Sequence, residues 1–142
     1  MTRPRLPRRG ALALLSCVVL SACAGLGQPV YTPHTLEGRV LPADPSAPLA
    51  AGSHVSVRLL DVGRAGAPST VLAEQIVESP RAFPVRFSLC YDRAALQGDG
   101  RYALDARVFV DGELRMIGER ALADPAADPP PHPDVVVTAL PR

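Results

Sequence analysis

The sequence predicts an all-β fold: a small antiparallel β-sandwich of about seven strands, preceded by a signal peptide and a flexible tether. Apolar and polar residues alternate with a period of two in several segments, which is typical of strands that bury one face. The dipeptide Asp111-Gly112 separates two apolar runs and favours a type I′ hairpin turn, in which both residues need a positive φ. No long segment has the period of an amphipathic helix, and short strands without long helices are typical of a sandwich.

The first 22 residues have the layout of a signal peptide. Residues 1–10 carry four arginines, and residues 11–20 are apolar and uncharged. As a helix this apolar stretch would span only about 15 Å, roughly half of a hydrocarbon core, so it does not predict a permanent membrane span. The pair Arg8-Arg9 leaves a twin-arginine signal as an alternative, although its flanking residues fit that pattern poorly.

The leader ends in Leu20-Ser21-Ala22-Cys23, which resembles the bacterial lipobox. Leu20, Ser21 and Ala22 would be recognised by the signal peptidase. The resemblance implies cleavage before Cys23, diacylglycerol on its thiol and an acyl chain on the new amine; we expect no other cofactor. Because two or more acyl chains anchor a protein stably, we expect a membrane-anchored protein. The alternative is an ordinary secretory signal with a chance cysteine.

Residue 24 is Ala rather than Asp, which in proteobacterial lipoproteins implies a location on the outer membrane, facing the periplasm. Residues 23–33 predict a lipidated N-terminus and flexible tether, which reaches about 33 Å when fully extended. Residues 34–142 predict one domain. All 14 acidic residues follow the leader, together with 11 of the 15 arginines, so the mature charge is 11 − 14 = −3. This balance does not indicate nucleic-acid binding.

The strands are clearest where alternation is strict. Residues 54–59, 83–91 and 101–110 each place apolar side chains on one face and mostly polar ones on the other. Weaker patterns predict further strands at residues 36–41, 71–77, 113–117 and 134–140. A short helical turn is predicted at residues 92–96, and residues 123–133, with five prolines, predict an extended surface segment.

Few residues are candidates for chemistry. His34, His54 and His132 are too far apart in sequence for a typical metal-ligand motif, so we expect surface or loop histidines and no metal. Cys90 is the one thiol left after processing and acylation, and a structural, semi-buried cysteine is favoured over a nucleophile. Ser56 near His54 lacks the nucleophile-elbow sequence, so no catalytic residue is predicted.

Phe109 and Ile117 are apolar at positions where the strand register predicts solvent. An exposed apolar stripe on neighbouring hairpin strands could bind a peptide, which makes both residues candidates for partner binding. Alternatively, both sheet faces are covered at this point, or a bulge shifts the register.

Six segments together resemble the YbaY/YscW group of lipoproteins: residues 36–40 (LEGRV), 55–61 (VSVRLLD), 71–75 (VLAEQ), 84–92 (PVRFSLCYD), 101–107 (RYALDAR) and 111–114 (DGEL). The resemblance covers roughly residues 35–120. It implies a small β-sandwich on the periplasmic side of the outer membrane. Some members act as pilotins, which bind a secretin subunit and help it to reach the outer membrane and assemble. The family offers no catalytic residues.

The resemblance and the lipobox together favour a non-enzymatic binding module. Its partners would be the membrane, through the lipid anchor, and an envelope protein client such as a secretin, held by strand addition or in an apolar groove. The alternative is a structural envelope lipoprotein that contributes to membrane integrity or stress tolerance without a single client. An enzyme is the least favoured class.

Overall fold

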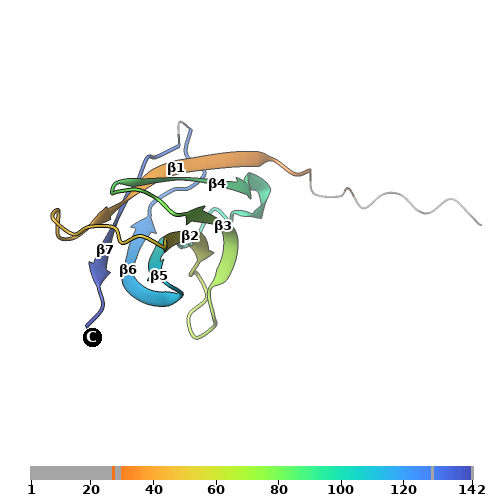
Figure 1. Cartoon of the computed structure of the whole chain (residues 1–142). Coiled ribbons are helices and arrows are strands. Elements are labelled where there is room, and N and C mark those ends of the chain that lie inside the picture. Colours follow the sequence, from red (N-terminus) through yellow and green to blue (C-terminus); the bar gives the residue numbers. More distant parts are fainter. Residues whose placement is uncertain (1–26, 28–29, 129, 142) are drawn as a thin grey trace, which may run out of the picture.

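A computed structural model describes residues 27, 30–128 and 130–141. This part contains seven strands and one 3-10 turn (Figure 1), which confirms the predicted all-β class. The elements are β1 (Pro33–Pro42), β2 (Ser53–Asp61), β3 (Thr70–Glu78), β4 (Val85–Asp92), η1 (Arg93–Ala95), β5 (Tyr102–Val110), β6 (Glu113–Leu122) and β7 (Asp134–Ala139). The predicted signal peptide, with Leu20, Ser21 and Ala22, and the predicted lipidation site Cys23 lie outside the described residues.

All seven strands form one sheet in the order β3-β2-β5-β6-β7-β1-β4. The sheet folds over on itself, so that β1 and β4 cross above β2, β5 and β6 in Figure 1. The two edge strands, β3 and β4, therefore come close together without forming a ladder, and the sheet is nearly closed like a barrel. Every ladder is antiparallel except the one between β1 and β7, which is parallel.

The core lies between the two layers and consists mainly of Val and Leu. The side chains of Leu36, Val57, Leu104 and Val135 are fully buried, and the strict alternation in β4 buries every second residue. Burial of one such side chain contributes roughly 1.5–3 kcal/mol, so this cluster supplies most of the driving force for folding. The alternating pattern that predicted these strands is thus the pattern that builds the core.

β6 is longer than the sequence pattern predicted, because it continues from Ile117 to Leu122. Gly118 interrupts the apolar alternation that ended the prediction. A Cβ on Gly118 would collide with the backbone carbonyl of Val136, so this glycine lets β7 approach β6 closely. The β5–β6 hairpin itself is as predicted: Asp111 and Gly112 have φ of 50° and 81°.

The proline-rich segment, residues 123–133, is less exposed than predicted. Pro125 and Pro133 are buried, and the Tyr91 hydroxyl donates a hydrogen bond to the Pro125 carbonyl. A guanidinium N–H of Arg93 donates to the Ala126 carbonyl at 2.6 Å. The segment therefore covers one end of the core. The predicted helical turn is confirmed as η1, where the Asp92 side chain accepts a hydrogen bond from the N–H of Ala94.

Candidate functional site

The outward-facing side of β3, β2, β5 and β6, called here the outer face, carries both residues that the sequence proposed for partner binding. Ile117 on β6 is 42% exposed and lies directly opposite Arg107 on β5. Phe109, two residues further along β5, is half-buried because its ring stacks on His54, with the ring centroids 4.8 Å apart. The structure thus places the two residues on neighbouring strands of one face, with Ile117 the more accessible.

A row of paired residues crosses this face from edge to edge. It runs through Ile76, Ser56, Arg107 and Ile117, each opposite the next on adjoining strands. Ile76 is 51% exposed and was missed in the sequence, because adjacent apolar residues in β3 obscure which of them faces outward. The row therefore offers two aliphatic side chains with a guanidinium between them.

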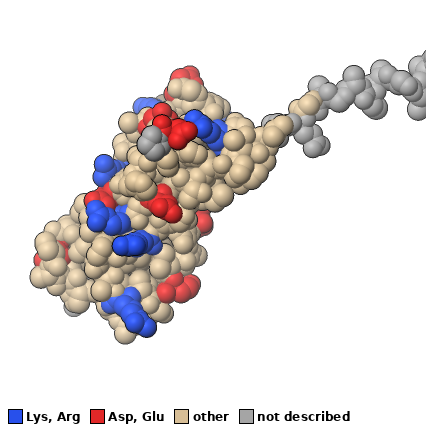
Figure 2. Space-filling view, turned by 90° about the horizontal axis from the view of Figure 1, so that it is seen from above, with Lys and Arg blue, Asp and Glu red and all other residues tan. Residues whose placement is uncertain are grey.

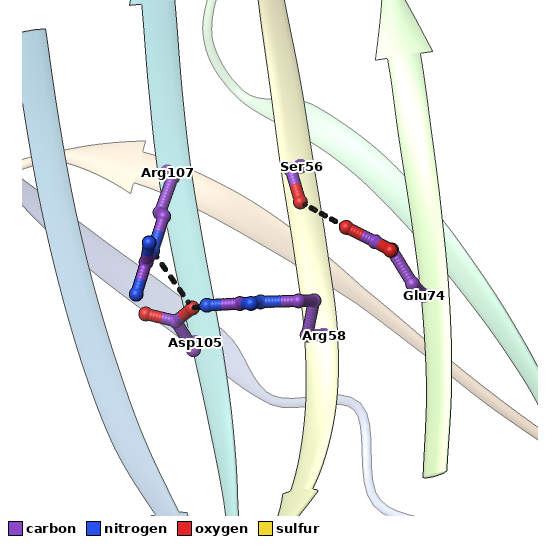
Figure 3. A network of polar contacts seen from close by, with 5 residues as sticks. All are labelled: Ser56, Arg58, Glu74, Asp105 and Arg107. Atoms are coloured by element: carbon purple, nitrogen blue, oxygen red, sulfur yellow. Dashed lines mark hydrogen bonds and ion pairs between the residues drawn. The ribbon is translucent and has the colours of Figure 1, made fainter. Parts of the chain in front are cut away.

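A polar network fixes the middle of the outer face (Figure 3). Asp105 accepts hydrogen bonds from Nε of Arg58 and Nε of Arg107, each at 3.0 Å, on the same carboxylate oxygen. The Ser56 hydroxyl donates to Glu74 at 2.8 Å. Although Asp105 points outward, it is only 8% exposed because the two arginine side chains cover it. Arg107 is oriented by this bond, yet its guanidinium keeps N–H groups for a partner carboxylate.

The two edges of the sheet face each other across a second feature, called here the seam, between β3 and β4. One side chain bridges it: the backbone N–H of Ser88 on β4 donates to Oε1 of Gln75 on β3 at 2.6 Å. A cavity of about 480 Å³ extends from the seam across β4 and β1. It is lined by Glu37, Gly38, Arg39, Gln75, Arg86, Phe87, Ser88 and His132.

Arginines face each other on the outside of β1 and β4, beside the seam. Arg39 lies directly opposite Arg86. Arg39 forms a two-bond ion pair with Asp134, at 2.9 Å for each bond, and hydrogen bonding from Arg39 lowers the pKa of the Asp134 carboxyl. Arg86 has no ion-pair partner among the residues that the structure describes. Figure 2, which looks down on the side where β1 and β4 lie, shows basic and acidic side chains interspersed.

Cys90 departs from its expected semi-buried state. It lies on the outward side of β4, where alternate residues are exposed, and is itself exposed. The Tyr31 hydroxyl lies 3.7 Å from its sulfur. The thiol therefore belongs to the same surface as the seam.

Comparison with known proteins identifies the family. The family model described as type III secretion system lipoprotein chaperone (YscW) matches residues 32–123, which is 92 of the 142 residues. The chain belongs to the YscW family. Among solved structures, an alternative pilotin from the type II secretion system of Vibrio cholerae is similar, with a TM-score of 0.68 and 28% sequence identity. That similarity covers 78% of this chain and 100% of the pilotin chain. No match was found among curated proteins.

The outer face of this YscW-family protein lies almost entirely within the matched residues, and so does the seam, whereas β7 follows them. Its β-rich fold agrees with the similarity to the pilotin, and family membership supports a chaperone-like role in a secretion system of the cell envelope.

The histidines of the YscW-family chain are dispersed. His54 stacks on Phe109 and His34 packs edge-on against Tyr91, while His132 is exposed at the cavity beside the seam. Within the described ranges, no three His, Cys, Asp or Glu side chains come together in a group that could hold a metal ion. In the same residues, no helix has the length and apolar character needed to cross a bilayer.

Proposed function

We propose that this YscW-family protein is a non-enzymatic chaperone, anchored by lipid to the outer membrane and facing the periplasm, that binds an envelope protein client in the manner of a pilotin. The observation that carries the proposal is the family match, which spans six of the seven strands and includes both candidate surfaces. The similarity to a pilotin over 78% of the chain supports the same role. A secretin is the client that this role implies.

The outer face supplies the contact. Ile76 and Ile117 lie at the two ends of one row, three strand spacings or about 14 Å apart. Between them, Arg107 is held in place by Asp105 and has N–H groups to donate. Two apolar anchors around an oriented cation suit a client segment that carries apolar side chains and a carboxylate.

The anchor makes modest affinity sufficient. Lipidation of Cys23 would hold the domain beside the membrane on a tether of about 33 Å at full extension, which raises its effective concentration near membrane-bound clients. Cys23→Ser tests this step by fractionation. We expect the wild-type protein to be found in the outer-membrane fraction and to be labelled by a radioactive fatty acid. The variant should be neither labelled nor found in that fraction. Labelled protein in the inner membrane would contradict the location while leaving the lipidation intact.

Client binding is tested by capture from detergent-solubilised envelopes, with the secretin detected by immunoblot. Ile117→Arg should reduce the amount of secretin captured at least fivefold. Val136→Arg is the matched control, because Val136 is 51% exposed but lies on β7, and it should capture secretin as the wild type does. Loss of capture in both variants, or in neither, would contradict the outer face as the contact. If deletion of the gene leaves the secretin correctly placed and causes only a diffuse barrier defect, the protein is a structural lipoprotein instead.

A further inference from the structure

The free edge of β4 presents unpaired backbone groups in a regular pattern. The N–H of Ser88 points to Gln75 on β3 and therefore away from β1, although Ser88 lies in the β1–β4 ladder. In an antiparallel ladder such outward-pointing residues alternate, so Arg86 and Cys90 also direct their N–H and C=O groups away from β1. Outside the strand ladders, no hydrogen bond within the described residues reaches the N–H of Arg86 or Cys90. β4 is thus ready to pair with another strand along at least three residues.

The seam is held by less than a ladder. The one hydrogen bond that spans it within the described part of the chain uses the side chain of Gln75, which takes the place that a backbone carbonyl would occupy in a closed barrel. The cavity of about 480 Å³ adjoins this bond. Rotation of one flexible side chain would release the Ser88 N–H. A strand that pairs with β4 lies about 4.8 Å from it, so β3, whose Cα atoms now come within 8 Å of those of β4, would move aside to admit the strand.

The charges around β4 favour an acidic residue in that strand. Arg39 and Arg86 are opposite each other, an arrangement of like charges that destabilises a sheet unless an anion compensates it. Asp134 compensates Arg39, but Arg86 has no ion-pair partner among the described residues. His132 adds a further basic group to the same cavity, while Glu37 is the one carboxylate in its lining. An incoming carboxylate would meet Arg86 first.

We propose that the seam binds one extended segment of a partner polypeptide, which joins the sheet as an eighth strand along the edge of β4. Residues of the segment that pair with Ser88 and its alternate neighbours direct their side chains outward, and one of them is an Asp or Glu that faces Arg86. The intervening residues are apolar, because they point to the side where Phe87 and Leu89 are buried. This proposal adds to the proposed chaperone function a second binding site and the residue types of the segment that it binds. It rests on the proposed function only for the identity of the protein that supplies the segment.

Synthetic peptides test the seam without the natural client. The probe is an acetylated nine-residue peptide of alternating Val and Thr with Asp at the central polar position, N-methylated at its apolar residues to prevent self-association. The control peptide is N-methylated at the polar residues instead, which removes the N–H groups that would pair with β4. Binding is followed on the isotopically labelled mature chain through the backbone amide signals in NMR spectra. We expect the first peptide to shift and protect the amides of Arg86, Ser88 and Cys90, and the control peptide to leave them unchanged.

A charge reversal tests the assignment of Arg86. Replacing the Asp of the probe by Lys should weaken binding to the wild type about five- to tenfold, and Arg86→Glu should reverse that preference. Arg64→Glu, in the exposed β2–β3 loop, should keep the wild-type preference. Gln75→Ala should tighten binding, because the Ser88 N–H no longer needs to be released.

Three results would overturn the seam proposal: no shift of the Arg86 and Cys90 amides at millimolar peptide, equal binding of the two methylated peptides, or shifts confined to Arg107 and Ile117. Each leaves the outer-face proposal standing, because that proposal depends on secretin capture and Ile117. Conversely, loss of secretin capture with intact peptide binding would refute the outer face and keep the seam.

Discussion

Arg58 on β2 and Asp105 on β5 lie directly opposite each other on the outer face, and two nitrogens of the Arg58 guanidinium donate to one oxygen of the Asp105 carboxylate. The same oxygen accepts a hydrogen bond from Arg107 (Figure 3). Asp105 is therefore the residue that orients the one guanidinium between the two exposed isoleucines. Asp105 therefore contributes to the stability of the domain and also to the geometry of the proposed contact.

Asp105→Asn should destabilise the domain by about 2 kcal/mol, because it leaves the partly buried guanidinium of Arg58 without its counter-charge. The free energy of unfolding, measured by urea titration, checks this value. The matched control is Glu113→Gln, which breaks the exposed ion pair with Arg115 and should cost less than about 0.5 kcal/mol. Equal effects of the two substitutions would show that the network adds no stability beyond that of a surface ion pair.

The sequence was sufficient to predict the strands because their core faces obey local alternation. The residues that decided β2, β4 and β5, such as Val57, Phe87 and Leu104, are all buried where the pattern placed them. The hairpin at Asp111 was predictable for the same reason: the φ requirement of its turn depends on two adjacent residues.

The rest could not be predicted, because it depends on contacts between residues far apart in the sequence. Alternation assigns Asp105 to solvent, but arginines from two strands cover it. Period-two patterns carry no information on strand direction, so the parallel pairing of β1 and β7 was not visible. The exposure of Ile76 and the Gln75–Ser88 bond across the seam follow from how the sheet folds over, which no local pattern specifies.

Gly118→Ala should destabilise the domain by roughly 2 kcal/mol, because the new methyl group would meet the carbonyl oxygen of Val136 and force β6 and β7 apart. Urea unfolding gives the total cost, and hydrogen exchange should show faster exchange of the β7 amides. Gly98→Ala is the control, since nothing lies within 4 Å of its added Cβ, and it should change stability by less than about 1 kcal/mol. A tolerated Gly118→Ala would mean that β7 is not packed tightly on β6.

Arg39→Gln should raise the pKa of the Asp134 carboxyl towards its ordinary value, because the hydrogen bonds and charge that now lower it would be lost. An NMR titration of the Asp134 side chain measures the shift directly. The ion pair stabilises the folded state above the ordinary pKa of Asp and is lost as the pH falls through the lowered value. Arg64→Gln should leave the titration of Asp134 unchanged; a shift there as well would show that the effect is one of net charge and not of the pair.

Burial raises the pKa of Tyr91 to about 12, which predicts a loss of stability in alkali. The contribution is fully present below pH 10, the ordinary value, and is lost between pH 10 and 12, because the unfolded chain releases the proton first. About 2 kcal/mol should disappear over that range. Urea unfolding at a series of pH values should show this fall in the wild type and a shallower one in Tyr91→Phe.

At neutral pH, Tyr91→Phe should lower the free energy of unfolding by about 1 kcal/mol, because the carbonyl of Pro125 loses its hydrogen bond. The proline-rich segment thereby loses this attachment to β4. Tyr31→Phe is the comparison, because the hydroxyl of Tyr31 is exposed and lies against Cys90. This variant should still lose most of the stability that the wild type loses between pH 10 and 12. If Tyr31→Phe flattens the profile as much as Tyr91→Phe does, the fall reflects general ionisation of tyrosine. Burial of Tyr91 beneath residues 123–133 would then not be the cause of the loss of stability in alkali. The hydrogen bond of Tyr91 would then not indicate that this segment covers the core.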